Sequence, residues 1–255
     1  MSLPTGASDW TNSLHPLHLG EARIERTDAG LRLIRLPSTA AIYSDAELLG
    51  REPNRWRPPL SLIVRARFSH PVEWLRGTAG FGFWNAGIGP TVRRPRPPRA
   101  VWFFFGGPPF DVPLALGVPG YGFKAAVLDA QRLLFFALLP FAPLGFLLMR
   151  QPTLYRWFWP IVQTAIGVAE VDLSELDLTA THSYRLDWRD GTATFGVDGQ
   201  EVMTAPAPAG PLELVIWIDN SYAIATPQGR FSLGLVAASE TQWLEIENVE
   251  VRVEG

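Results

Sequence analysis

Residues 182–202 read HSYRLDWRDGTATFGVDGQEV and carry the clearest structural pattern in the chain. Apolar and polar residues alternate through Ser183–Trp188 and again through Ala193–Val197, as they do in strands with one buried face. Asp190-Gly191 between them has the composition of a two-residue hairpin turn. A second turn at Asp198-Gly199 leads into Glu201–Met203. The stretch therefore predicts a three-stranded antiparallel meander.

Proline and glycine punctuate the whole sequence. Each occurs 23 times in 255 residues, and short β-branched or aromatic runs recur between them, which is typical of a sandwich or barrel. We therefore expect an all-β, two-sheet antiparallel jelly-roll sandwich that forms a single domain over residues 1–255. The expected strands outside the C-terminal part of the meander are Leu31–Leu36, Leu60–Phe68, Ala79–Asn85, Ala100–Phe105, Gly122–Leu128, Ser183–Trp188, Ala193–Val197, Leu212–Ile218, Ala223–Thr226, Phe231–Val236 and Leu244–Val253.

The composition excludes several function classes. The chain has no cysteine, so disulfide scaffolds, thiolate metal sites and cysteine nucleophiles are ruled out. A net charge of −3 argues against nucleic-acid binding. We predict no metal and no cofactor, because His15 and His18 have no acidic partner spaced to complete a metal site. The first 20 residues lack the pattern of a signal peptide, so we expect a cytoplasmic location.

One segment breaks the β pattern. Residues 133–149, LLFFALLPFAPLGFLLM, contain no charge and lie between two arginines. A straight helix of this length would span roughly 25 Å, less than the ~30 Å hydrocarbon core, and its prolines would interrupt it. We expect an apolar helical insertion near 131–166, acting as a lid or as a membrane-interface hairpin. The mixture of Trp, Tyr and Arg in LYRWFWPIVQTAIG (154–167) suits a membrane interface or a pocket mouth.

The run YRLDWRDGTATFGVDGQEV (184–202), followed by PLELVIWIDN (211–220), resembles the late strands of concanavalin A-like lectin/glucanase jelly rolls, especially family 16 glycoside hydrolases. GFGFWNAG (80–87) and AVWFFFGG (100–107) are similar to the strands that line the concave groove of that family. The resemblance covers about residues 60–130 and 180–253. It implies a jelly roll with a groove on one sheet and a carbohydrate ligand.

The chain differs from that family in the strand that carries the family's catalytic residues. The family's catalytic strand reads E-x-D-x-E, which places a nucleophile and a proton donor on one face. The strand in the comparable place is Val101–Phe105, without a carboxylate. EVDLSELD (170–177) has similar acidic spacing, and we interpret it as a solvated strand end and turn, with a displaced glycosidase pair as the alternative. Retaining glycoside hydrolysis is therefore not expected from this motif.

The segment VIWIDNSY (215–222) contains the strongest candidate acid. Trp217 and Asp219 share one face of the predicted strand, with Asn220 and Tyr222 at or beyond its end. In one interpretation Asp219 is an acid, base or hydrogen-bond acceptor on a groove floor, and Trp217 is a stacking platform. In the other, Asp219 or Asn220 accepts hydrogen bonds from nearby amides in a turn. Both interpretations stay open.

Lys124 is the only lysine beside 21 arginines, and it lies on the apolar run GYGFKAAVLDAQ (120–131). A lysine with a lowered pKa could act as a base, a Schiff-base amine or an anion ligand. The alternative is a partly exposed ion pair with Asp129 or Asp111. Asp129 is itself a further acid–base candidate. The remaining ligand-binding candidates, which could equally be core or framework residues, are Trp84, Asn85, Trp102 and Phe104.

These features lead to one main hypothesis and two alternatives. The main hypothesis is that the groove binds a large hydrophobic small molecule, such as a lipid, isoprenoid or polyketide, with acid–base conversion of the isomerase or cyclase type as an added step. The first alternative is a divergent carbohydrate-active protein, either hydrolase-like or a sugar-binding module. The second is a non-catalytic interaction protein or homo-oligomer that uses the apolar insertion. Peripheral membrane contact through residues 133–159, on the inner face of the membrane, is a further expectation.

Overall fold

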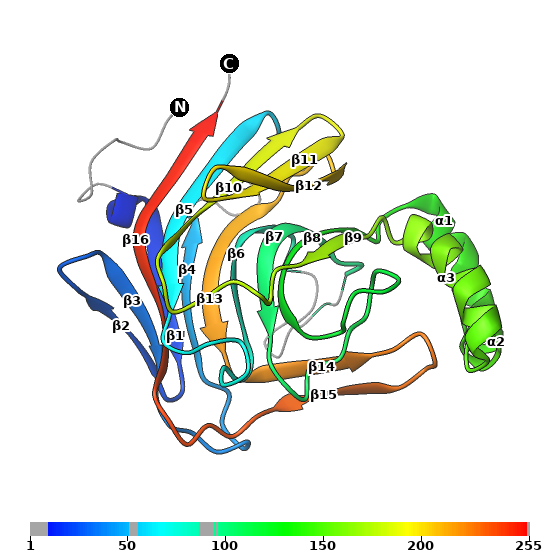
Figure 1. Cartoon of the computed structure of the whole chain (residues 1–255), viewed down its shortest axis with the longest axis horizontal. Helices are drawn as coiled ribbons and strands as arrows, with labels where there is room; N and C mark the ends of the chain where they lie inside the picture. Colours follow the sequence, from blue (N-terminus) through cyan, green and yellow to red (C-terminus); the bar gives the residue numbers. More distant parts are fainter. Residues whose placement is uncertain (1–9, 51–55, 87–93, 95, 254–255) are drawn as a thin grey trace.

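A computed structural model describes residues 10–50, 56–86, 94 and 96–253. Its main feature is a pair of seven-stranded antiparallel sheets packed face to face (Figure 1). In sheet A the strand order is β1 (Leu14–Leu19), β4 (Asp45–Gly50), β13 (Glu213–Asp219), β6 (Thr78–Trp84), β7 (Arg99–Gly106), β8 (Gly122–Asp129) and β9 (Ala169–Asp172). In sheet B it is β12 (Gln200–Pro206), β11 (Thr192–Val197), β10 (His182–Arg189), β5 (Leu60–Phe68), β16 (Gln242–Val253), β3 (Leu31–Arg35) and β2 (Ala22–Arg26). The predicted two-sheet jelly-roll sandwich is confirmed.

The meander predicted from residues 182–202 forms β10, β11 and β12 at one edge of sheet B. Leu186 pairs with Phe195, as the alternation requires. Gly191 in the first turn has φ +74°, and Asp198 in the second has φ +51°. Both turns therefore use the left-handed backbone region that an Asp-Gly sequence tolerates best.

All eleven strands that we expected are present, each within two residues of its predicted ends. Four others, β1, β2, β4 and β9, were not expected. Three of them are edge strands, and their sequences carry the features by which edge strands avoid further pairing. The strand β1 reads LHPLHL with an internal proline, β2 reads ARIER, and β9 has only four residues.

The core lies between the two sheets and is rich in aromatic rings. Phe81 and Phe103 of sheet A contact Tyr184 of sheet B at centroid distances of 4.9 and 5.1 Å. Phe103 also meets Phe195 edge to face at 5.3 Å. These side chains are 0–1% exposed, so they join the sheets through direct ring contacts.

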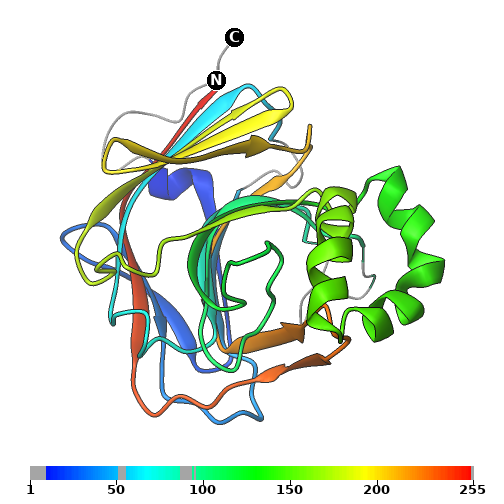
Figure 2. The same cartoon turned by 45° about the vertical axis from the view of Figure 1, so that its right-hand side comes forward.

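The predicted insertion is helical, as expected. It comprises α1 (Leu133–Leu138), the 3₁₀ turn η2 (Leu139–Phe141), α2 (Ala142–Leu148) and α3 (Pro152–Ala165). Prolines stand where the chain bends from α1 to α2, because proline cannot donate the helical hydrogen bond. No helix in the described residues is long and apolar enough to span a membrane. Figures 1 and 2 show the helices projecting from the side of the sandwich, near the tip of a separate hairpin, β14 (Ser221–Ala225) and β15 (Phe231–Leu235).

Replacing Phe103 by alanine tests the aromatic core. The ring contacts Phe81, Phe123, Tyr184 and Phe195, so Phe103→Ala should lower the free energy of unfolding by about 3–5 kcal/mol. Urea unfolding followed by circular dichroism measures the loss. Trp74→Ala, at a ring that is 66% exposed, should change stability by less than about 0.5 kcal/mol. Equal losses in the two variants would contradict this assignment of the core.

Candidate functional site

The face of sheet A that points away from sheet B carries a row of aromatic rings. Trp102 is central: its ring lies 5.6 Å from Trp84, 5.3 Å from Phe104 and 5.3 Å from Trp217. Phe110, in the loop after β7, continues the series at 5.1 Å from Phe104. We call these five residues the aromatic row. Four of them are ligand-binding candidates from the sequence, and the fold brings them together from three strands.

Glycines on β6 make room for the row. Gly80 and Gly82 point to this outer face, between the tryptophans of β13 and β7. A Cβ at Gly80 would lie 2.9 Å from Cη2 of Trp217, and one at Gly82 would lie 2.6 Å from Cβ of Trp102. The two indoles can therefore meet across β6 only because that strand has no side chains there. The alternation G-F-G-F in GFGFWNAG thus serves a packing purpose; Gly87, its last residue, lies outside the described residues.

Three carboxyl groups lie together beside the row on β4 and β13, and a fourth, Glu213, lies farther along β13 opposite Trp84. Asp45 pairs directly with Asp219 across the two strands, and Glu47 pairs with Trp217. We call Asp45, Glu47 and Asp219 the acidic cluster. Of these three, only Asp219 was predicted from the sequence. The alternation Asp-Ala-Glu at 45–47 was the available signal, but β4 was not recognised as a strand.

Burial raises the pKa of every member of the acidic cluster. It raises the pKa of Asp45 to about 9, with the charges of Glu47 and Asp219 adding to the effect. It raises the pKa of Glu47 to about 7, with Glu213 and Asp219 adding. The pKa of Asp219 is raised as well, by burial. Carboxyl groups this close and this dry cannot all ionise, so the cluster retains protons near neutral pH.

Asp219 combines both interpretations offered by its sequence. It lies on the outer face of sheet A, and its carboxylate also accepts hydrogen bonds from the backbone amide and hydroxyl of Ser221, as in the turn interpretation. It accepts two more from the amide and hydroxyl of Thr78. Trp217 Nε1 donates to the same Thr78 hydroxyl at 3.0 Å. Asp219 therefore helps to fix one ring of the aromatic row.

Lys124 occupies the other side of the row, on β8, and is 2% exposed. Its Nζ lies 3.4 Å from Oε1 of Glu170 on β9. The predicted partly exposed pair with Asp129 or Asp111 is therefore wrong, because the lysine is buried and the neighbouring strand β9 supplies its carboxylate partner. Burial lowers the pKa of Lys124, and burial raises that of Glu170, while each partner's charge opposes the other's shift. Ala115 from the loop after β7 also donates its amide to Glu170 at 3.0 Å.

The acidic stretch 170–177 divides between two environments. Its last three carboxylates, Asp172, Glu175 and Asp177, are exposed at the strand end and turn, as predicted. Glu170 is the exception, because its side chain is buried against Lys124. The stretch therefore contributes one carboxylate to the outer face of sheet A.

Two candidates lie at the end of the sheet instead of in the row. Asp129 pairs with Arg99 at 3.0 Å and with Arg132 at 3.5 Å. Asn85 accepts a hydrogen bond from the amide of Arg99 and donates to the carbonyl of Pro97. Both side chains fix the backbone where it enters the sheet at the start of β7 and leaves it at the end of β8. The structure gives them framework contacts and does not bring them to the aromatic row.

Asn220 and Tyr222 also lie outside the row. Asn220 is fully buried; it accepts a hydrogen bond from the amide of Ser44 and donates to the carbonyls of Ile42 and Val236. Tyr222 lies on β14, where its hydroxyl is 3.4 Å from the Ser232 hydroxyl of β15. Asn220 therefore joins the end of β13 to the segment before β4 and to the segment after β15. Tyr222 belongs to the separate hairpin.

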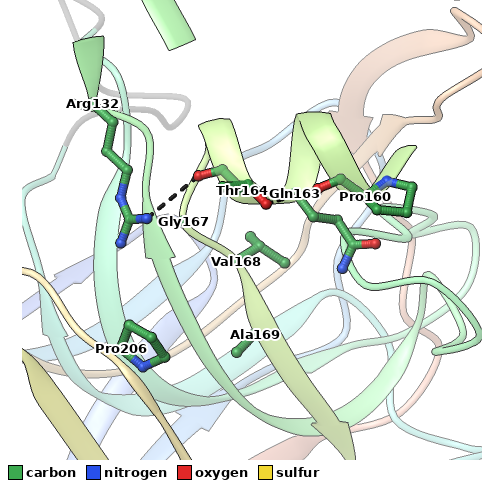
Figure 3. A pocket seen from close by; sticks show the side chains of 8 residues that line it. All are labelled: Arg132, Pro160, Gln163, Thr164, Gly167, Val168, Ala169 and Pro206. Carbon is green, nitrogen blue, oxygen red and sulfur yellow. Dashed lines mark hydrogen bonds between the residues drawn. The ribbon is translucent and has the colours of Figure 1, made fainter. Parts of the chain in front are cut away.

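A small cavity of about 310 Å³ lies elsewhere, between the end of α3 and strand β9 (Figure 3). Arg132, Gln163 and Thr164 supply its polar lining, and Arg132 donates to the carbonyl of Thr164. Its volume is at the lower limit for small-molecule sites, and part of its lining is charged. It does not offer the large apolar space that the main hypothesis requires. Across the described ranges, no three His, Asp or Glu side chains form a metal-holding group.

No protein-family model matches the chain, and no curated protein matches its sequence. Among solved structures it is similar to a legume lectin-like domain from Entamoeba histolytica, with TM-score 0.54 and 8% identity over 100% of this chain and 97% of that one. It is similar to a Bacillus licheniformis β-glucanase, with TM-score 0.51 and 13% identity over 100% and 98%. A prokaryotic β-1,3-1,4-glucanase (lichenase) derived from a mouse hindgut metagenome gives TM-score 0.51 and 14% identity over 100% and 99%. At these identities the likeness establishes the fold: the chain is a jelly roll of the kind found in glucanases and lectin-like domains, as its sequence resemblance implied.

Gly80→Ala tests the packing of the row. The added methyl group would meet both the carbonyl of Phe103 and the Trp217 ring, so we expect a loss of about 1–3 kcal/mol of stability and a changed near-ultraviolet circular dichroism spectrum. Gly145→Ala in α2 is the control, because the nearest atom to its new Cβ is 3.9 Å away. It should be neutral or stabilising by up to about 1 kcal/mol. A Gly80→Ala protein with wild-type stability and spectrum would refute this role of β6.

The acidic cluster predicts that stability falls as the pH rises. Glu47 and Asp45 keep protons in the folded state that the unfolded chain releases near pH 4, so the stabilisation is complete below that pH and is lost through about pH 7 and then about pH 9. The free energy of unfolding should therefore be lower at pH 8.5 than at pH 5.5. Glu47→Gln should reduce that difference by on the order of 2 kcal/mol, since only the interval from pH 5.5 to the folded pKa of about 7 contributes. Urea titrations at both pH values measure it; Glu175→Gln, at an exposed carboxylate, should leave the wild-type difference intact.

Proposed function

We propose that the protein is carbohydrate-active and binds a glycan chain along the aromatic row of sheet A. The observation that carries the proposal is the row itself, in which Trp84, Trp102 and Phe104 are only half-buried on the outer face of the sheet. Flat rings in series can stack against successive sugar rings, whose C–H faces are apolar. The glucanase-like and lectin-like fold supports the same class of ligand.

Polar groups on both sides of the row support this proposal. The acidic cluster lies on one side, and Lys124 with Glu170 lies on the other. Glu47 is the partly exposed member of the acidic cluster and can meet sugar hydroxyls at the rim of the stacking surface, where a partly protonated carboxyl group supplies both a donor and an acceptor. A face that combines rings with titratable groups suits a glycan better than a wholly apolar ligand. The main hypothesis from the sequence, a large hydrophobic small molecule in a groove, has no comparable support.

Trp102→Ala tests glycan binding directly. We expect the full wild-type chain to bind at least one of three oligosaccharides: cellotetraose, laminaritetraose or mixed-linkage β-glucan tetrasaccharide. Isothermal titration calorimetry measures this binding. Loss of the central ring should weaken that binding at least tenfold, about 1.4 kcal/mol, whereas Trp102→Phe should retain most of it. Trp74→Ala, which removes an exposed ring outside the row, is the matched control. Thermal melting verifies that each variant is folded; a folded wild-type protein that binds no glycan of a wider panel would refute the proposal.

Glycoside hydrolysis is a second candidate, favoured by the protonation of the acidic cluster. A carboxyl group with a pKa of about 7, such as Glu47, can donate a proton to a leaving oxygen at neutral pH. Asp45 and Glu47 are two residues apart on one strand, so their side chains lie on the same face of the sheet; Glu47 is the proton donor of this candidate, because Asp45 keeps its own proton at neutral pH. The proton donor would then come from β4 instead of from the strand used by the family that the sequence resembles.

Release of reducing ends from mixed-linkage β-glucan distinguishes hydrolysis from simple binding. If the protein hydrolyses the glycan, Glu47→Gln should lose at least 100-fold in rate, about 2.7 kcal/mol, while glycan affinity persists. Glu175→Gln should keep the wild-type rate. Glycan binding without any release of reducing ends would leave the binding proposal intact and exclude hydrolysis of that glycan.

A further inference from the structure

The helical insertion and the β14–β15 hairpin together expose an apolar surface. Of the 19 large apolar side chains exposed in the described residues, 12 lie in residues 133–161 or on β15. Leu133 is 89% exposed and Trp157 is 72% exposed. Scattered apolar side chains are common on soluble proteins, but a concentration of this kind marks an interaction site. We call residues 133–161 together with Phe231 and Leu233 the apolar projection.

Two segments that are distant in sequence form the projection. Phe146 of α2 contacts Phe231 of β15 at a centroid distance of 5.1 Å, and Arg150 donates to the carbonyl of Gln228 in the hairpin turn. Leu233, two residues beyond Phe231 on the same strand, is 84% exposed. The tip of the hairpin therefore extends the surface begun by the helices (Figure 2).

The projection is attached to the sandwich by its other side. Trp159 is buried and donates from Nε1 to the carbonyl of Leu114 at 3.0 Å. Gln163 accepts the amide of Leu116, and Met149 is buried beneath the helices. Specific inward contacts hold α3 against the loop after β7. The outward apolar face is thus a feature of a packed element.

The charges around the projection have one sign. Residues 130–169 contain no Asp or Glu, whereas Arg150 and Arg156 are exposed there, and Arg230 is exposed next to Phe231. Tyr155 and Trp157 flank Arg156, and aromatic rings beside cationic groups favour the headgroup region of a bilayer. A second copy docked on this face would bring arginines together with no carboxylate in 130–169 to pair with them.

We propose that the apolar projection inserts into the interfacial region of an anionic lipid bilayer without crossing it. The exposed Leu, Phe and Trp side chains enter the boundary between headgroups and acyl chains, and the arginines bind lipid phosphates. The helices are too short and too often interrupted to span the membrane, which fits a protein that lies on its surface. The inference is independent of the glycan site, because no residue of the aromatic row belongs to the projection.

Vesicle sedimentation with the full chain tests the proposal. Sucrose-loaded vesicles of phosphatidylcholine with phosphatidylglycerol should carry the protein into the pellet, and pure phosphatidylcholine vesicles should bind it more weakly. The triple variant Phe141→Ser, Leu144→Ser and Trp157→Ser should reduce the apparent affinity at least tenfold. Because all three side chains are exposed, the variant should fold as the wild type does, which thermal melting verifies. Trp74→Ser replaces an equally exposed ring elsewhere and should bind as the wild type does.

Two further variants separate the parts of the surface. Arg156→Glu with Arg230→Glu should weaken binding to anionic vesicles at least fivefold and change binding to neutral vesicles little. Leu233→Ser should weaken binding to both, because the hairpin tip enters the same layer. Wild-type protein that stays in the supernatant with both vesicle types would overturn the proposal. So would a concentration-dependent dimer in sedimentation velocity that the triple variant abolishes without any vesicle binding, since the surface would then join two copies.

Discussion

Sheet A packs side chains on both of its faces, and this constraint underlies the rest of the molecule. One face meets sheet B through rings such as Phe103, and the other carries the aromatic row centred on Trp102. A strand buried on both sides shows a continuous apolar run, as β7 does, instead of an alternation. The outer rings fit over β6 only because residues 80 and 82, on that face, are glycines and carry no side chain.

Burial on the outer face also sets its chemistry. Burial of the carboxyl groups beside the row disfavours their charged forms, and neighbouring carboxylates add to the effect, so the pKa values of Asp45 and Glu47 rise. On the opposite side of the row, Lys124 keeps its partner Glu170 close, because an unpaired buried charge would cost far more. The aromatic row thus lies between the acidic cluster, which retains protons, and the Lys124–Glu170 ion pair.

Local patterns predicted most of the framework. The meander at 182–202 and the helical insertion near 131–166 were both confirmed, since turn chemistry and long apolar runs with prolines act over short range. Edge strands were missed because their charges and prolines, which prevent aggregation, also hide the strand pattern. Missing β4 meant missing Asp45 and Glu47. The cytoplasmic location and the single domain over residues 1–255 stay predictions.

The sequence by itself determined the class of fold, the helical nature of the insertion and that Trp217 and Asp219 share one face of a strand, because each depends on residues that are neighbours along the chain. Only the tertiary structure decided which side chains meet. Asp45 and Asp219 are 174 residues apart, and Phe146 reaches Phe231 across 85 residues, so strand order and register, not local periodicity, join them. The acidic cluster and the two-part apolar projection are therefore products of the assembled sheets.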